Sequence, residues 1–185
     1  MTQKGVGEME KTAILYQSKY GATRRYAEML REALGCESYD LKRQGCPDLA
    51  PYRCLVFAGG IYAGGVAGLS VLRKKYPQLK GKRLAVFCVG ASPYDEKTLE
   101  QLRNRCLKGE LSRIPLFYGR GAWNESVMSG PDRFLCGMLQ KSVARQDPST
   151  LEPWARALLE ASGKACDWTD KAYLEPLLRF LREEA

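Results

Sequence analysis

Three short segments carry residue types that suit ligand binding, and each directly follows an apolar run. The first, residues 18–23 (SKYGAT), supplies hydroxyl groups, a glycine and consecutive backbone N–H groups immediately before a helical pattern. Unpaired N–H groups and the macrodipole at a helix N-terminus favour an anion such as phosphate. The segment lacks the lysine of a Walker loop, which argues against a nucleoside triphosphate. An ordinary helix cap would use the same residues, so this segment alone does not establish a phosphate site.

The other two segments each present a tyrosine among small residues. Residues 59–65 (GGIYAGG) place Tyr62 among four glycines, and residues 90–95 (GASPYD) place Tyr94 after the next apolar run. Glycines let the backbone approach a flat ligand while one aromatic face is presented. Each tyrosine taken singly is more often a packing residue. Together the three segments predict a planar heteroaromatic ligand that carries one phosphate.

The composition excludes several other kinds of chemistry. The chain of 185 residues contains no histidine, so histidine-ligated zinc and Ser-His-Asp triads are absent. Its seven cysteines include no C-x-x-C pair, which argues against an iron–sulfur cluster, a zinc ribbon or a disulfide framework. We therefore expect no metal site, reduced thiols and a cytoplasmic location.

Strand-like and helix-like segments alternate along the first two thirds of the chain, which predicts parallel βαβ units. Residues 54–58 form a continuous apolar run typical of a central strand that is buried on both faces. The helical pattern of residues 24–34 ends at Gly35. Residues 54–72 carry no charge, but their five glycines argue against a membrane span. The pattern predicts an α/β fold with a doubly wound, five-stranded parallel sheet, whose strands are residues 12–17, 36–41, 54–58, 83–89 and 114–118, with loops and helices at 64–76 and 93–106.

The pattern changes after Gly119, and no further strand is expected. We predict a helical insertion over residues 120–165, in which Ser149 and Glu152 form a capping box and one apolar stripe comprises Phe134, Leu135, Met138, Leu139 and Val143. The insertion either thickens the core or covers the ligand site. Residues 170–184 are expected to be helical, with Pro176 at the first position or at a kink. The whole chain, residues 1–185, is expected to form a single domain after a short polar lead over residues 1–11, in which Met9 is an alternative start.

The three segments resemble the flavodoxin-like FMN proteins, whose phosphate loop has the form Ser/Thr-x-Thr-Gly-x-Thr. Ser18, Gly21 and Thr23 match this form, whereas Tyr20 replaces the middle threonine and Ala22 replaces a common asparagine. The resemblance covers residues 12–119 and implies strand order 2-1-3-4-5, FMN as cofactor, and Tyr62 and Tyr94 on the two sides of the isoalloxazine ring. The cofactor-binding residues that it implies are Ser18, Lys19, Tyr20, Gly21, Ala22, Thr23, Gly60, Ile61, Tyr62, Ala63, Gly64, Gly90, Ala91, Ser92 and Tyr94.

The chain is also similar to a branch of that family which includes the bacterial quinone-linked protoporphyrinogen oxidase. The similarity lies in YQSKYGATRRYAE, in GGIYAGG and in the closing DWTDKAYLEP. It implies an FMN-dependent redox protein that transfers electrons or oxidises or reduces a small molecule or quinone, with peptide groups around Ala63 and Gly64 near flavin N5. Asp95 is interpreted as a helix cap. Two alternatives stay open: a binding module that has lost FMN, and a protoporphyrinogen oxidase-type enzyme proper.

The positive charge lies in the first half of the chain. Residues 1–92 carry 15 Lys and Arg against 7 Asp and Glu, whereas the remainder carries 14 of each. A dense basic group precedes and opens the fourth expected strand; it comprises Arg73, Lys74, Lys75, Lys80, Lys82 and Arg83. A solvated helix end is the ordinary interpretation, and an acidic protein or an anionic membrane surface is the partner that the group would bind. No helix-turn-helix or zinc motif indicates specific nucleic-acid binding.

Overall fold

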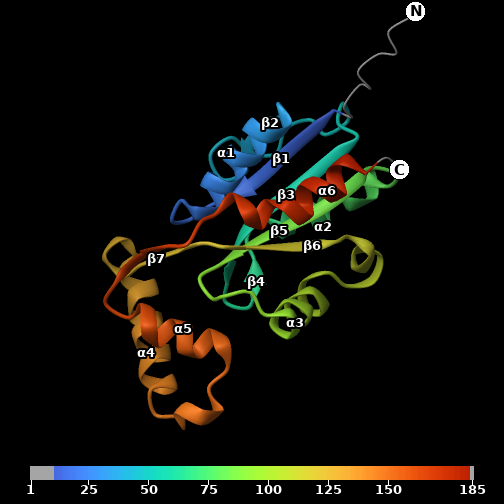
Figure 1. The fold of residues 1–185 in the computed structure, drawn as a ribbon. Helices are drawn as coiled ribbons and strands as arrows, with labels where there is room; N and C mark the ends of the chain where they lie inside the picture. Colours follow the sequence, from blue (N-terminus) through green and yellow to red (C-terminus); the bar gives the residue numbers. More distant parts are fainter. Residues whose placement is uncertain (1–10, 184–185) are drawn as a thin grey trace, which may run out of the picture.

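A parallel sheet forms the centre of the molecule (Figure 1). The computed structural model describes residues 11–183, and within them the parallel strands run in the order β2-β1-β3-β5-β6. These strands are β1 Thr12–Gln17, β2 Glu37–Asp40, β3 Cys54–Tyr62, β5 Arg83–Gly90 and β6 Leu116–Arg120. The predicted order 2-1-3-4-5 is confirmed, because β5 and β6 are the fourth and fifth parallel strands. Met9, most of the expected polar lead and Glu184 lie outside the described residues.

Helices cover both faces of this sheet. On one face α1 (Ala22–Leu34) and α6 (Glu175–Arg182) pack against the alternate strand residues that include Val56 and Phe87. On the other face α2 (Leu69–Leu79) and α3 (Glu96–Cys106) pack against Phe57 and its neighbours. Because β3 lies between these two cores, residues 54–58 are buried at every position, as their continuous apolar run predicts.

Glycines with positive φ flank α1, and an aspartate side chain caps the start of α3. Gly21 precedes α1 with φ +97°, and Gly35 ends it with φ +60°, both in the left-handed region that glycine adopts freely. Asp95 caps α3, since its carboxylate accepts a hydrogen bond of 2.8 Å from the Thr98 amide. Hydrogen bonds from Thr98 hold the pKa of Asp95 below its usual value. The interpretation of Asp95 as a helix cap is therefore confirmed.

A tight hairpin follows the third parallel strand, where the sequence predicts only a loop and a helix. The short strand β4 (Gly65–Val66) pairs antiparallel with the end of β3, so that Ala63 and Gly64 form a two-residue turn with φ +48° and +73°. Positive φ at both positions is typical of the type I′ turn. The uncharged residues 54–72 thus form β3, this hairpin and the first turn of α2. None of the helices in residues 11–183 combines the length and apolar character needed to cross a membrane.

The insertion contains two strands that the sequence did not predict. β7 (Ala122–Asn124) pairs antiparallel with β8 (Ala165–Asp167), and the two helices α4 (Gly130–Val143) and α5 (Pro153–Ala161) lie between them. The helices form a lobe beside the sheet, around a small core that includes Val143 and Ala155 (Figure 1). The predicted helices of the insertion are confirmed, but the expectation of no strand after Gly119 is wrong. Three-residue strands offer too few positions for an alternating pattern to be recognised.

Short 3-10 helices complete the described chain. Two of them lie where the sequence predicts the start of an α-helix. The 3-10 helices are η1 Gly109–Arg113, η2 Glu125–Val127, η3 Pro148–Thr150 and η4 Lys171–Leu174. The predicted Ser149 and Glu152 capping box is wrong: the Asp147 carboxylate caps η3, and α5 begins at Pro153 without a side-chain cap. The expected terminal helix is divided into η4 and α6, with Pro176 in the first turn of α6, where its missing N–H is not required.

Candidate functional site

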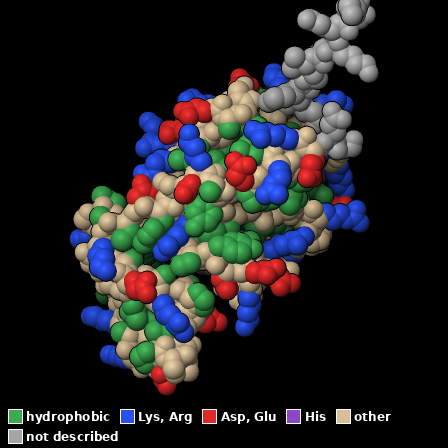
Figure 2. Space-filling view, in the orientation of Figure 1, with side chains coloured by type: hydrophobic (Ala, Val, Ile, Leu, Met, Phe, Trp, Pro, Cys, Tyr) green, Lys and Arg blue, Asp and Glu red, His purple; other side chains and the backbone are tan. Residues whose placement is uncertain are grey.

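The loops after β1, β3 and β5 open onto one cavity of about 670 Å³, and the insertion forms its opposite wall. This volume lies within the range of small-molecule sites, and the carboxyl edge of a doubly wound sheet is where such sites occur. Hydrophobic side chains gather where the lobe meets the body of the molecule (Figure 2). The structure brings most of the predicted cofactor-binding residues to this cavity: Ser18, Lys19, Tyr20, Ala22, Thr23, Gly60, Ile61, Tyr62, Ala63, Gly90 and Ala91.

Gly21, Gly64, Ser92 and Tyr94 do not line the cavity. Gly21 forms the N-cap of α1, and its amide donates a hydrogen bond to the Ser18 hydroxyl at 3.1 Å. The Gly64 carbonyl faces α3, where it accepts a hydrogen bond of 3.4 Å from Arg105. The contact of Gly64 with flavin N5 therefore stays a prediction that this geometry does not favour.

The two predicted ring-flanking tyrosines occupy different places. Tyr62 lines the cavity, whereas Tyr94 lies outside it with its ring centroid 6.1 Å from that of Tyr118. The Tyr118 hydroxyl donates a hydrogen bond to the Ser92 carbonyl, which fixes the loop that carries Tyr94. The cavity has a different second aromatic residue, Trp123 of β7.

One end of the cavity suits an anion. The N-terminus of α1 has no side-chain cap, and the N–H groups of a first helical turn have no acceptor within the helix. Thr23, which is buried, and Ser18 add hydroxyl groups at the same end. Lys42, in the turn after β2, also lines the cavity; its backbone amide donates to the Asp40 carboxylate at 3.0 Å, which fixes the turn. Sequence reasoning missed Lys42, because it lies in the turn after β2 and outside the three segments that the sequence singled out.

A buried carboxylate from the insertion lies in the cavity wall. Asp132 of α4 accepts hydrogen bonds from the hydroxyl of Tyr62 at 2.8 Å and from the hydroxyl of Tyr20, and the ammonium group of Lys19 lies 2.5 Å from it. These donors, Lys19 foremost, hold the pKa of Asp132 well below its usual range. Sequence reasoning missed Asp132, since it looks like an ordinary first-turn acid of a helix.

The remaining wall is apolar and also comes from the insertion. It is formed by Trp123, Met128, Leu135, Cys136, Leu139 and Leu158. A smaller crevice of about 90 Å³, lined by Trp123 and Trp154 among others, adjoins the cavity, with which it shares Trp123, Leu139 and Leu158. Both indole N–H groups donate to glutamates, at 3.2 Å to Glu125 and 2.6 Å to Glu152. With their polar atoms paired, the two indoles offer carbon surface to a ligand.

The family follows from the sequence together with this fold. Residues 13–150 match the family model of the flavodoxin domain. The chain belongs to the flavodoxin domain family. The match extends past β6 into the insertion, as far as η3. No curated protein matches the chain.

Several solved structures resemble this flavodoxin domain distantly. The flavodoxin, WrbA-like protein from Agrobacterium tumefaciens is 21% identical, with 67% of this chain and 88% of that chain covered at a TM-score of 0.42. A flavoprotein in complex with FMN from Lactobacillus acidophilus NCFM is 16% identical, with 60% and 92% covered at a TM-score of 0.39. Rubredoxin oxygen:oxidoreductase from Desulfovibrio gigas is 16% identical, with 82% and 37% covered at a TM-score of 0.43. At these scores the likenesses carry no argument about function.

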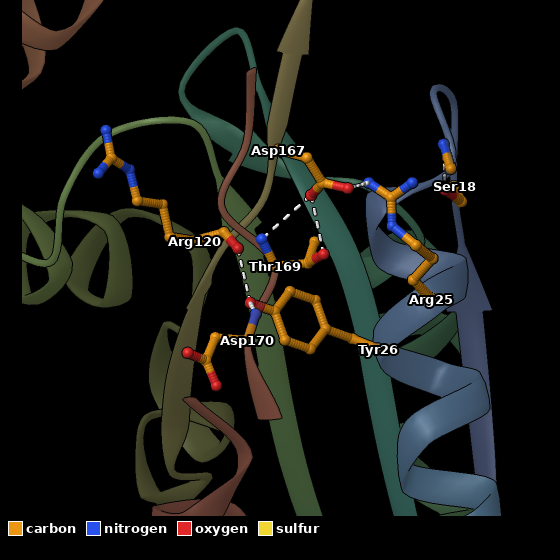
Figure 3. A network of polar contacts seen from close by, with 8 residues as sticks. Ser18, Arg25, Tyr26, Arg120, Asp167, Thr169 and Asp170 are labelled. Carbon is orange, nitrogen blue, oxygen red and sulfur yellow. Dashed lines mark hydrogen bonds and ion pairs between the residues drawn. The ribbon is translucent and has the colours of Figure 1, made fainter. Parts of the chain in front are cut away.

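The base of the insertion is tied to α1 of the flavodoxin domain by a polar network (Figure 3). Arg25 pairs with Asp167 at 3.2 Å. The Tyr26 hydroxyl donates to the Arg120 carbonyl at 2.6 Å and accepts from the Asp170 amide at 3.2 Å. Burial raises the pKa of Tyr26 to about 12. The segment that closes the insertion is therefore fixed against the helix whose N-terminus opens onto the cavity.

Removing the Tyr26 hydroxyl should weaken this connection. Tyr26 is fully buried, so Tyr26→Phe leaves the Arg120 carbonyl and the Asp170 amide without their partner. We expect the free energy of unfolding to fall by about 1–3 kcal/mol, measured by urea denaturation. Tyr76→Phe is the control, because its exposed hydroxyl makes a single bond of 3.3 Å to the Glu110 carbonyl. Equal losses in the two variants would contradict the prediction.

Proposed function

We propose that this flavodoxin domain binds FMN and acts as a redox protein. The observation that carries the proposal is the cavity at the carboxyl ends of β1, β3 and β5. It combines an uncapped helix N-terminus with the aromatic side chains of Tyr62 and Trp123 in its lining. A single anion site beside aromatic surfaces suits a planar ring with one phosphate. Membership of the flavodoxin family supports the same ligand.

The residues present fit FMN. The phosphate would be held by the backbone at the start of α1 with Ser18 and Thr23, and Lys42 would supply positive charge. Tyr20 replaces the threonine of the family's phosphate loop, and its hydroxyl is already bonded to Asp132. Backbone donors therefore carry more of the phosphate binding here. FAD is disfavoured, since its second phosphate and adenosine find no matching glycine fingerprint.

Bound FMN would supply the electron transfer, and the chain's residues would bind it, orient it and exclude water. The insertion contributes apolar side chains to the cavity. This supports the interpretation that the insertion covers the ligand site over the interpretation that it only thickens the core. An apolar wall and crevice beside the ring site suit a small, largely apolar molecule. We therefore favour an oxidoreductase that acts on a small molecule or quinone, as in the protoporphyrinogen oxidase branch, over an electron carrier with an open flavin edge. If the protein is instead an electron carrier, its partner would be a redox donor or acceptor protein.

We also propose a cytoplasmic protein that binds an acidic partner or an anionic surface weakly. Most side chains of the basic group are paired with other groups of the same chain. Lys80 pairs with Glu110, and Arg73, Lys82 and Arg83 donate to backbone carbonyls of Cys106, Tyr52, Leu181 and their neighbours. Lys74, which is exposed on α2, and Lys75, which is partly buried on the same helix, are the contact residues that we propose. Such binding is expected to be lost near physiological salt, because screening acts over about 8–10 Å.

The test of the proposed function is an FMN titration followed by visible absorption, with the flavin then released by heat and identified by chromatography. We expect FMN to bind and to be the released species. Tyr62→Ala should weaken binding roughly fivefold, because aromatic stacking contributes about 1 kcal/mol beyond area burial. Tyr62→Phe should recover most of the affinity.

The matched control for Tyr62 is Tyr94→Ala. Both tyrosines are half exposed, at 51% and 56%, but only Tyr62 lines the cavity. We expect a smaller effect of Tyr94→Ala on both affinity and reduction potential. FAD as the major released flavin, or no flavin bound at saturating FMN, would overturn the proposed function.

A further inference from the structure

Asp132 is an anomaly in the insertion. It is a charged residue only 4% exposed, although it lies on a helix whose neighbouring side chains, such as Phe134 and Leu135, are mostly in solvent. Buried carboxylates are rare and need partners that compensate for lost hydration. All three side chains that contact its carboxylate come from outside the insertion: Lys19 and Tyr20 follow β1, and Tyr62 ends β3.

The contacts around Asp132 join the insertion to the loop after β1 and to the end of β3. Its amide donates to the Ser129 hydroxyl at 3.4 Å, in the first turn of α4, where the helix dipole favours a negative charge. The Ser129 amide in turn donates to the Tyr20 hydroxyl at 3.3 Å. Tyr20 therefore bonds the insertion twice, once as donor and once as acceptor. Hydrogen bonds to an ionised carboxylate are about twice as strong as neutral ones.

The same contacts fix the side chain that we expect against the flavin ring. Tyr62 is 51% exposed, so packing holds only part of its side chain. Its hydroxyl is held by Asp132 at 2.8 Å, and the Lys19 ammonium group lies 4.7 Å from its ring centroid. One carboxylate thus sets the position of an aromatic ring and of a cation on the cavity wall.

We propose that Asp132 is a positioning residue: by binding Lys19, Tyr20 and Tyr62 it holds the insertion closed over a flat, phosphate-bearing ligand and slows the release of that ligand. The proposal rests on the proposed function for the identity of the ligand. The closing contact itself involves only side chains of this chain, so it can be tested apart from the ligand. We assign Asp132 a positioning role rather than a catalytic one, because the role argued for it acts through Lys19, Tyr20 and Tyr62.

The experiment compares Asp132→Asn with Glu160→Gln, which removes the same charge from an exposed position on α5 of the same insertion. Hydrogen exchange of α4 amides is measured in the ligand-free protein, and FMN release is followed by the flavin fluorescence that returns on dissociation. We expect Asp132→Asn to speed α4 exchange and FMN release each by about tenfold to a hundredfold, from the loss of charge-assisted hydrogen bonds. Glu160→Gln should behave as the wild type. Tyr20→Phe keeps the ring and removes only one hydroxyl, so it should give a smaller increase in the same direction.

The outcomes separate this proposal from the proposed function. Unchanged α4 exchange in Asp132→Asn overturns the closing contact, whether or not FMN binds. Faster exchange with unchanged FMN release shows a contact that only stabilises the insertion, which also overturns the positioning role. If Asp132→Asn does not fold, α4 exchange and FMN release are measured in Tyr20→Phe instead, and unchanged values overturn the proposal. A wild type that binds no FMN contradicts the proposed function, and the exchange measurement still tests the contact.

Discussion

Replacing Gly21 by aspartate should abolish detectable FMN binding. Gly21 precedes α1 with φ +97°, a conformation that residues with a Cβ adopt only at a cost of roughly 1–2 kcal/mol. A Cβ there would meet no atom within 4 Å, so crowding is not the cause. The aspartate would add a negative charge beside the helix N-terminus that we expect to bind phosphate, and like charges repel strongly where water is excluded. We expect a more than hundredfold rise in the FMN dissociation constant, measured by fluorescence titration.

Two alanine variants separate the backbone from the charge. Gly21→Ala introduces the same backbone strain without charge, and we expect it to weaken FMN binding about tenfold. Gly35→Ala introduces similar strain, at φ +60° and again in open space, but at the other end of the same helix. It should lower stability and leave FMN affinity unchanged. If Gly21→Asp binds FMN as tightly as Gly35→Ala, the anion does not bind at the start of α1.

Gly59→Ala should destabilise the protein strongly, because it forces a side chain against fixed backbone. A Cβ on Gly59 would lie 2.0 Å from the Ala67 carbonyl oxygen and 2.9 Å from its carbon. Those atoms are backbone, held by the hydrogen bond of 3.0 Å from the Ala67 amide to the Gly60 carbonyl, so no side chain can rotate away. Ala67 and the short strand β4 that precedes it would have to move away from β3. We expect a loss of about 3 kcal/mol in the free energy of unfolding, measured by urea denaturation.

Gly60→Ala is the matched control for Gly59→Ala. Its Cβ would lie 3.7 Å from the Thr23 hydroxyl oxygen, an ordinary contact distance. The free energy of unfolding should change by less than about 1 kcal/mol. Gly60 lines the cavity, so the added methyl group should instead reduce the space for the ligand and weaken FMN binding. Equal destabilisation by the two variants would show that the hairpin does not pack closely against Gly59.

The sequence alone was enough to predict the sheet, and most of the residues that it indicated for the site line the cavity at the carboxyl edge of that sheet. Continuous apolar runs such as residues 54–58 occur in strands covered on both faces, and alternation with helices restricts the order of parallel strands. That order places residues 18–23, 59–65 and 90–95 at one edge, because parallel strands end on the same side. Gly35 and Asp95 act within a few residues of their position, so their roles as helix end and helix cap were predicted correctly.

Only the tertiary structure decided which residues lie opposite the loops after β1, β3 and β5. β7 and β8 are three residues each, and they pair across the whole length of the insertion. Tyr94 lies outside the cavity, in a loop that is bonded to Tyr118 on the neighbouring strand. Trp123 takes a place in the cavity wall, and Asp132 reaches partners more than 60 positions away in the chain. Local patterns report which face of an element is apolar, but they do not report which distant side chain meets it. The closing of the cavity depends on such distant pairs, and therefore only the folded chain reveals it.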